Sequence, residues 1–352
     1  MKVLILGGTG AMGAHLSELA ARAGYKVVVT SRTRRSEASP IRYVCGNARD
    51  NGFLASLLQE RWDVVVDFMV YSTAEFAARR DLLLANTDQY VFLSSSRVYA
   101  ASESPLCEDS ARLLDVCEDL AYLATDEYAL AKARQEDLLA QSNLRNWTII
   151  RPYITYSEQR LQLGVMEKEA WLYRALRGRS IVLSREIASR QTTLTYGLDV
   201  SRGILAVMGG PRCHGEAYHI TASQSATWGE VLGIYTTILA KHLGRLPRVC
   251  LIDHAAFCTA HHNRYQISYD RMYDRIFDNE KIGSLVDTGS FVELKRGLSE
   301  CLLAFLTRPV FASINWKEEA HKDRRARERT PLREVSGLKQ RLKYLSYRYV
   351  FN

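Results

Sequence analysis

The chain has 352 residues, of which 47% are hydrophobic and 24% are charged, a composition typical of an ordinary globular protein with more than one packed unit. No apolar stretch is long enough to span a membrane, and the seven cysteines include no C-x-x-C pair, which argues against a disulfide or zinc framework. Of the net charge of +8, the last forty residues carry +6, with eleven Lys or Arg against five Asp or Glu, so we expect a nearly neutral body that binds no nucleic acid.

The N-terminal residues predict a nucleotide-binding turn. An apolar run at residues 3–6 is typical of a buried parallel strand, and Gly7-x-x-Gly10-x-x-Gly13 follows it, ahead of a helix that Gly24 ends. Glycines at this spacing let the backbone turn tightly and approach a dinucleotide pyrophosphate, which the amides at the helix N-terminus then bind. The alternative is that the three glycines serve only the packing of strand on helix. Because the first strand begins at residue 3, we also expect no signal peptide and a cytoplasmic protein.

Further apolar strands alternate with helical segments, which predicts a parallel sheet covered on both faces. The fold class that follows is α/β, with a Rossmann-type doubly wound parallel sheet whose ligands bind at the carboxyl ends of the strands. The predicted strands after the first are residues 26–30, 41–45, 64–69, 90–94 and 147–151.

The alternation loosens after Tyr153, which predicts a smaller C-terminal α/β domain. Residues 167–176 and 228–243 have helical patterns, and residues 180–183 resemble a strand. We therefore divide the chain into a dinucleotide-binding domain, a mainly substrate-binding domain and a basic extension. Their predicted bounds are 1–155 with a returning segment near 190–222, then 156–312, then 313–352.

A serine cluster and a Tyr-Lys pair follow the fifth strand. Ser94-Ser95-Ser96 stands at the end of that strand, and Tyr128 precedes Lys132 by four residues on a predicted helix, so the last two share one helical face. A phenol has an unperturbed pKa near 10, but a nearby ammonium and a positive nicotinamide ring both favour its anion, which can then exchange a proton with a sugar hydroxyl. The alternative for Tyr128 and Lys132 alone is a solvated helix face. The histidines lack partners at metal-ligand spacing, so we predict no metal site.

With these motifs the chain resembles the extended short-chain dehydrogenase/reductases, the NAD-dependent epimerase/dehydratase family, over roughly its first 310 residues. The motifs that carry the resemblance are Gly7-Gly-Thr-Gly10-Ala-Met-Gly13, Ser94-Ser-Ser-Arg-Val-Tyr99, Tyr128 with Lys132, and Arg151-Pro152-Tyr-Ile-Thr-Tyr156. The resemblance implies that Ser95, Tyr128 and Lys132 are catalytic and that Lys132 also holds the nicotinamide ribose. The cofactor contacts that it implies are Gly7, Thr9, Gly10, Met12, Gly13, Ser31, Arg32, Asn47, Ala48, Met69 and Lys132.

Two departures from the family pattern narrow the expected reaction. Arg32 follows the second strand, where members that prefer NAD usually carry an acid, so it favours NADP(H) over NAD(H), unless it is only a solvated surface arginine. Ser96 and Arg97 stand where dehydratases have an Asp-Glu pair, which makes dehydration unexpected. Reduction of a keto-sugar nucleotide at one carbon remains, as does 4-epimerisation with a retained NAD. A catalytically silent cofactor-binding scaffold is the alternative of another class.

The expected substrate is a nucleotide-diphosphate sugar. Arg271 and Arg275 occupy positions at which family members often hold the diphosphate, with ion pairing to neighbouring aspartates as the alternative reading. The predicted substrate contacts are Ser96, Tyr153, Arg190, Arg271 and Arg275. The segment between residues 71 and 89 has room for one helix only, so a homodimer of the family type is not assured.

The last forty residues extend beyond the resemblance. Leu338, Leu342 and Leu345 recur at helical spacing among Lys and Arg residues, a pattern compatible with an anionic membrane or a partner protein, or with packing back onto the enzyme.

Overall fold

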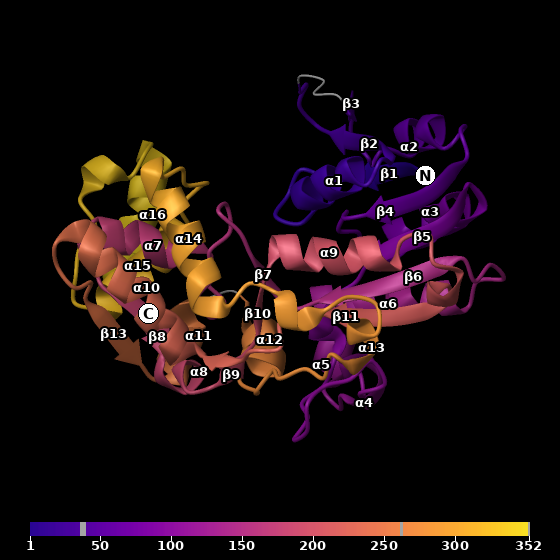
Figure 1. Ribbon diagram of the computed structural model, residues 1–352. Coiled ribbons are helices and arrows are strands. Elements are labelled where there is room, and N and C mark those ends of the chain that lie inside the picture. Colours follow the sequence, from indigo (N-terminus) through magenta and orange to yellow (C-terminus); the bar gives the residue numbers. More distant parts are fainter. Residues whose placement is uncertain (36–39, 261–262, 351–352) are drawn as a thin grey trace. The chain divides into compact units, whose positions relative to one another are not determined.

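The computed structural model describes residues 1–35, 40–260 and 263–350, which divide into two compact units (Figure 1). The first unit holds residues 1–155, 193–224 and 276–292. The second holds residues 156–192, 225–275 and 293–352, so the basic C-terminal segment belongs to it. The chain therefore passes between the units more than once.

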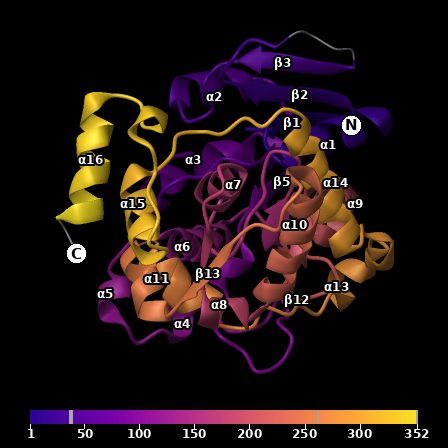
Figure 2. The same cartoon turned by 90° about the vertical axis from the view of Figure 1, so that its left-hand side faces the viewer.

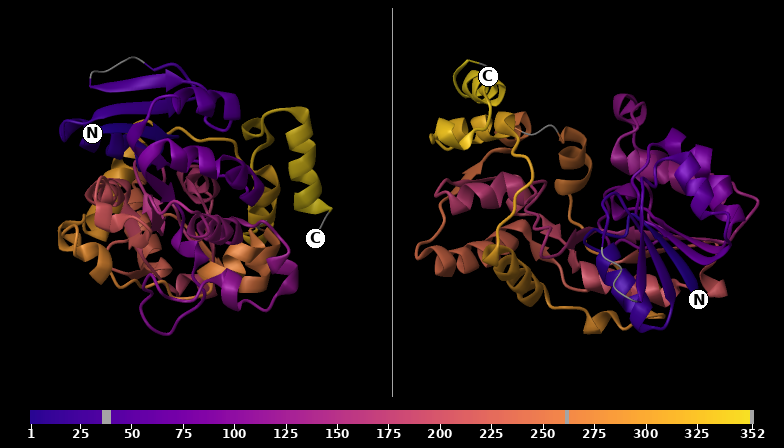
Figure 3. Two further views of the ribbon diagram at one scale, coloured as in Figure 1. Left: turned by 90° about the vertical axis from the view of Figure 1, so that its right-hand side faces the viewer. Right: turned by 90° about the horizontal axis from the view of Figure 1, so that it is seen from above.

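The first unit contains a seven-stranded sheet in the order β11-β6-β5-β4-β1-β2-β3, and all of its pairings are parallel. The right-hand view of Figure 3 shows strands of this sheet side by side. The chain order reverses between β1 and β4, which is the arrangement that opens a ligand crevice at the carboxyl ends of those strands. The strands are β1 (Lys2–Leu6), β2 (Lys26–Ser31), β3 (Ile41–Cys45), β4 (Trp62–Asp67), β5 (Thr87–Leu93), β6 (Trp147–Pro152) and β11 (Glu216–Ile220).

Helices cover both faces of this sheet, which confirms the predicted Rossmann-type fold. Alternate residues of each strand serve the two layers: Val3 and Ile5 pack in the layer that contains α1 and α9, whereas Leu4 and Leu6 pack in the layer that contains α2, α3 and α6. The helices of the unit are α1 (Gly13–Arg22), α2 (Asn51–Leu57), α3 (Thr73–Ala85), α4 (Leu113–Val116), α5 (Leu120–Leu123), α6 (Tyr128–Ala140), α9 (Gly197–Val207) and α13 (Glu280–Gly283).

The second unit is mostly helical, with two short strand pairs in place of a broad sheet. β8 (Ile181–Ser184) pairs with β13 (Val249–Ile252) in parallel, and β9 (Gln191–Thr192) pairs with β12 (Ala226–Thr227) in antiparallel fashion. Its helices are α7 (Lys168–Leu176), α8 (Arg185–Ala188), α10 (Trp228–Leu243), α11 (His254–Ala260), α12 (Arg264–Gln266), α14 (Leu294–Thr307), α15 (Trp316–Arg325) and α16 (Leu338–Tyr349). The remaining short strands of the chain are β7 (Ile154–Tyr156) and β10 (Leu194–Tyr196).

The C-terminal helices pack against α7 around a buried arginine. The Arg174 guanidinium donates to Glu319 and Asp323 at 2.8 Å each and to Glu328 at 3.0 Å, and Tyr344 donates to Asp323 at 2.7 Å. An arginine without exposed surface requires such partners, because an unpaired buried charge is strongly destabilising. This network holds α15 and α16 to the rest of the second unit.

Candidate active site

The glycine turn after β1 is shaped to admit a ligand. Gly7 has a φ of +68°, which L-residues with a side chain rarely adopt, and its amide donates to the Thr30 hydroxyl at 2.9 Å. A Cβ on Gly13 would lie 2.5 Å from the Cα of Gly8, so this glycine permits the close packing of α1 on the turn. A Cβ on Gly10 would meet no atom within 4 Å. Gly10 thus faces open space, as expected where a pyrophosphate approaches the backbone.

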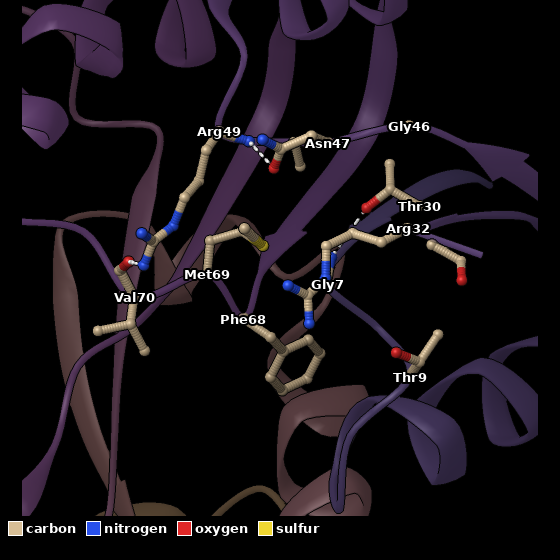
Figure 4. Close-up of a pocket in the computed structure, with 12 residues that line it drawn as sticks. Gly7, Thr9, Thr30, Arg32, Gly46, Asn47, Arg49, Phe68, Met69 and Val70 are labelled. Carbon is tan, nitrogen blue, oxygen red and sulfur yellow. Dashed lines mark hydrogen bonds between the residues drawn. The ribbon is translucent and has the colours of Figure 1, made fainter. Parts of the chain in front are cut away.

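A pocket of about 590 Å³ opens beside this turn, at the carboxyl ends of β1 to β4 (Figure 4). Arg32 and Arg49 bring two guanidinium groups to it from opposite sides in this view, and both residues are exposed. The Arg49 guanidinium donates to the Val70 carbonyl, which also lines the pocket. The lining residues are Gly7, Thr9, Thr30, Ser31, Arg32, Gly46, Asn47, Ala48, Arg49, Phe68, Met69 and Val70.

The structure brings most of the predicted cofactor residues to this one pocket. Those that line it are Gly7, Thr9, Ser31, Arg32, Asn47, Ala48 and Met69, whereas Gly10, Met12 and Gly13 belong to the adjacent turn and Lys132 lies on α6. The lining residues that were not predicted as cofactor contacts are Thr30, Gly46, Arg49, Phe68 and Val70. The signal that could have found them is position, because each is adjacent in the sequence to a predicted contact.

The three predicted catalytic residues lie on two neighbouring elements of the same unit. Ser95 follows β5 and caps a short 3₁₀ turn by accepting a 3.2 Å hydrogen bond from the Arg97 amide. Tyr128 begins α6 and is half-buried, and Lys132 follows one turn later. The Lys132 ammonium donates to the carbonyl of Leu93 at 2.7 Å, which places it two residues from Ser95 on the end of β5. α6 is therefore held with its Tyr-Lys face at the carboxyl edge of the sheet.

A buried acid lies beside Lys132. Asp67, the last residue of β4, is in register with Phe92 of β5, and the Lys132 ammonium is 4.5 Å from the centre of the Phe92 ring. The Asp67 carboxylate accepts hydrogen bonds of 2.9 Å from the Tyr90 hydroxyl and from the Met69 amide. Burial raises the pKa of Asp67, against the effect of these bonds and of Lys132.

The ammonium of Lys132 is nearly inaccessible to water. Burial lowers the pKa of Lys132 to about 8, while the charges of Asp67 and Glu136 act in the opposite direction. The nearby acids thus favour the charged form of the lysine, which burial disfavours. Asp67 was not assigned a role from the sequence.

Arg97 places a second positive charge next to the predicted catalytic phenol. Its guanidinium lies 5.3 Å from the centre of the Tyr128 ring and forms a 2.6 Å ion pair with Glu127. Glu127 in turn caps α6 by accepting a hydrogen bond from the Ala129 amide. Arg97, which stands where dehydratases have an acid, therefore orients the start of α6 through Glu127.

Two of the three clustered serines support the sheet. Ser94 donates to Glu136, which binds the Arg151 guanidinium through bonds of 2.8 and 2.9 Å. Ser96 has no exposed surface, and its hydroxyl donates to the Arg151 carbonyl at 2.7 Å. The structure thus gives the Ser96 hydroxyl a structural partner, and its role as a substrate contact stays a prediction. Ser95 remains the predicted catalytic member of the cluster.

The predicted diphosphate arginines are buried in the second unit. Arg271 and Arg275 both form ion pairs with Asp270, the latter at 2.9 Å, and Arg271 donates to the Gly164 carbonyl at 3.0 Å. Their exposed fractions are 2% and 0%, so the ion-pair alternative describes their environment in this structure. Arg190 is half-exposed, and among the described residues its buried Nε has no hydrogen-bond partner. The role of Arg190 as a substrate contact stays a prediction.

Tyr153 is buried in the first unit, where its ring lies 5.3 Å from that of Phe277.

Within the described ranges no three His, Cys, Asp or Glu side chains gather as metal ligands, and none of the helices described has the length and apolar character needed to cross a bilayer.

A family model described as "NAD dependent epimerase/dehydratase family" matches residues 3–221 of the chain. The chloroplast stem-loop binding protein of 41 kDa b from Arabidopsis thaliana is 27% identical over an alignment of 246 residues that covers 64% of this chain and 60% of that protein. The chain thus matches less than two thirds of the length of this relative.

Solved structures with the same fold align with this chain over nearly their whole length. A UDP-glucuronic acid 4-epimerase from Bacillus cereus, in complex with UDP-glucuronic acid and NAD, superposes with a TM-score of 0.66 at 18% identity, over 87% of this chain and 100% of its own. The enzyme WbmH from Bordetella bronchiseptica, in complex with NAD⁺, gives 0.68 at 18% identity over 88% and 99%. A dTDP-glucose 4,6-dehydratase from Bacillus anthracis, in complex with NAD, gives 0.65 at 17% identity over 88% and 97%. At these identities the likeness establishes the fold.

Proposed function

The chain belongs to the NAD dependent epimerase/dehydratase family, and we propose that it reduces a keto-sugar carried on a nucleoside diphosphate, at a single carbon. The observation that carries this proposal is the placement of Tyr128, Lys132 and Ser95 at the carboxyl end of β5, in the unit that also holds the glycine turn and its pocket. When bound, a nicotinamide dinucleotide supplies the hydride for such a reaction.

The glycine turn fits the pyrophosphate of such a cofactor. Gly10 leaves open space at the N-terminus of α1, where backbone amides and the helix dipole favour an anion. The pocket lined by Asn47 and Ala48 would hold the adenosine half, and Lys132 would hold the nicotinamide ribose.

The chain's own residues then move one proton. Ser95 would donate a hydrogen bond to the carbonyl oxygen of the substrate and hold it in place. Tyr128 would give its hydroxyl proton to that same oxygen as the carbon is reduced, and the Lys132 ammonium would stabilise the phenolate left behind. Since the positions after Ser95 hold Ser96 and Arg97, the chain lacks there the acid pair that elimination of water would need.

We further propose that NADP(H) is preferred over NAD(H). Arg32 at the end of β2 and Arg49 after β3 both line the pocket, and a guanidinium binds a 2′-phosphate through paired hydrogen bonds. The structures named above contain NAD, so NAD-dependent 4-epimerisation of a nucleotide sugar is the second enzymatic candidate. It differs in a testable way, because an epimerase retains its cofactor and needs no added reductant.

A candidate of another class is supported by the plant relative, whose name describes binding to stem-loops. In this case the chain would be a scaffold that binds an RNA stem-loop, with or without a cofactor. A gel-shift titration with an RNA stem-loop tests it directly, and a Tyr128→Phe variant should bind that RNA as the wild type does.

The enzymatic proposal is tested with Tyr128→Phe, which removes the proton and leaves the ring in place. We expect turnover of UDP- and dTDP-linked 4-keto-sugars with NADPH to fall by roughly 10³-fold, in the middle of the range for a general acid, while NADPH affinity changes by no more than about twofold. Tyr25→Phe is the matched control, since Tyr25 packs under the sheet beside α1 and β2. Equal turnover in the two variants would refute the assigned role of Tyr128.

A further inference from the structure

The last helix exposes a stripe of apolar side chains. Leu338, Leu342, Leu345 and Tyr349 follow one another at steps of four, three and four residues, so they lie along one side of α16. Leu338 is 73% exposed, and Leu342 and Tyr349 are each 57% exposed. A stripe of this spacing normally faces a protein core, whereas here only Leu345 packs against buried residues and the other three side chains face solvent.

The opposite side of α16 is the one that anchors it. Tyr344 has no exposed surface, and its hydroxyl donates to Asp323 at 2.7 Å and accepts from the Thr330 amide at 2.9 Å. The Tyr347 ring lies 5.6 Å from that of His321 on α15. Figure 2 shows α16 (yellow) packed beside α15. Because the tyrosine side is buried, rotation of the helix to hide its leucines would break these contacts.

Cations flank the stripe on both sides, and α16 contains no acid. At 100° per residue, Arg341 and Arg348 fall on one side of the leucines, whereas Lys339 and Lys343 fall on the other. Lys339, Arg341 and Lys343 are exposed. An apolar stripe bordered by cations is the pattern of a helix that lies in the plane of an anionic membrane surface.

We propose that α16 docks on the surface of a membrane with anionic lipids, its leucine stripe inserted among the acyl chains and its lysines and arginines on the headgroups. The charge of the helix argues for this occupant over a second copy of the chain, because two such faces would bring like charges together. It also favours lipid over nucleic acid, since sequence-independent nucleic-acid sites use basic grooves with aromatic stacking and not a row of leucines.

The test uses the full-length protein and vesicles of phosphatidylcholine alone or mixed with phosphatidylglycerol, with bound protein measured by sedimentation. We expect retention on the mixed vesicles only, weakened by added salt. The double variant Leu338→Ser/Leu342→Ser should bind the mixed vesicles at least about tenfold more weakly than the wild type, because the inserted apolar surface is lost. The matched control is Leu246→Ser/Leu303→Ser, which changes two leucines of the same unit that are 70% and 53% exposed but lie outside the stripe.

A Tyr349→Trp variant provides a second readout, because insertion should shift its fluorescence to shorter wavelength on anionic vesicles. Equal binding of the two double-leucine variants, or no retention of the wild-type protein, would overturn the proposal. A concentration-dependent dimer that only Leu338→Ser/Leu342→Ser disrupts would assign the stripe to a second copy instead. Binding of an RNA stem-loop that the same variant abolishes, without vesicle binding, would assign it to nucleic acid.

Discussion

The buried pair of Asp67 and Lys132 gives a sharp prediction about the charge at the candidate active site. Asp67→Asn removes the negative charge but keeps the size of the side chain and an oxygen that can accept from Tyr90. Lys132 would then remain buried, with one of its two nearby acids gone. We expect its ammonium to lose its proton more easily.

The size of the effect follows from the pKa of about 8 that burial imposes on Lys132. A lysine with that pKa is roughly 90% charged at pH 7. Loss of a nearby opposite charge typically shifts a pKa by about one unit or more. A shift of about one unit from the pKa of about 8 would leave roughly half of Lys132 charged at pH 7, and a larger shift would leave less. The charged form would be restored by acid, because protonation of an amine increases as the pH falls.

The titration can be followed by NMR of the protein labelled with ¹³C-lysine, with the Lys132 signal assigned by its loss in Lys132→Arg. The variant should titrate at lower pH than the wild type, and NADPH binding should weaken at neutral pH if the ammonium holds the ribose. Tyr90→Phe is the control, since it removes a hydrogen bond to Asp67 but leaves the charge in place. If folded Asp67→Asn shows the wild-type titration of Lys132, the carboxylate does not sustain the ammonium and the reasoning fails.

Three further predictions concern the cofactor pocket and the C-terminal helices. Arg32→Glu should weaken NADPH binding by about 10- to 100-fold and leave NADH affinity nearly unchanged; equal loss for both cofactors in fluorescence titrations would remove the 2′-phosphate assignment. Gly10→Val should abolish dinucleotide binding without lowering the melting temperature, because its Cβ meets open space, whereas Gly13→Ala should lower the melting temperature because its Cβ would collide with Gly8. The opposite ranking of the two variants in thermal melts would contradict this account of the turn. Arg174→Ala should destabilise the second unit by about 3–5 kcal/mol in urea unfolding, because it leaves buried carboxylates unpaired, and a loss below about 1 kcal/mol would show that this network is not what holds the C-terminal helices.

Features set by neighbouring residues could be predicted from the sequence. The predicted helix over 228–243 is α10, and Gly244 ends it in the left-handed conformation, with a φ of +67°. The glycine turn, the start of α6 and the helical period of Leu338 and Leu342 are equally local, since each depends on residue spacing within one or two turns of the chain.

Features set by distant pairing could not be predicted in this way. β11 completes the sheet by pairing with β6, some seventy positions earlier, and its short sequence contains a glutamate and a histidine that no strand pattern singles out. The strand predicted over 180–183 is β8, but it pairs only with β13, so the expected α/β character of the second unit reduces to two short strand pairs among helices.

Side-chain partners were the least predictable part of the site. Spacing placed Tyr128 and Lys132 on one helical face, but the contact of Lys132 with Leu93 and the burial of Asp67 beside it depend on how α6 packs on the sheet. The helical period of α16 was evident from the sequence, but the side of the helix that is buried was not. Tyr344 occupies the buried side, because its large ring packs there and its hydroxyl donates to Asp323.

The central claim is that a nicotinamide cofactor bound on the glycine turn reaches Tyr128. A crystal structure of the protein with NADPH and a nucleoside diphosphate sugar tests it most directly. We predict the pyrophosphate against Gly10, the nicotinamide ribose on Lys132, and the substrate oxygen within hydrogen-bond distance of the Tyr128 and Ser95 hydroxyls. Density for the dinucleotide away from Gly10, or a Tyr128 hydroxyl remote from the nicotinamide ring, would contradict the account.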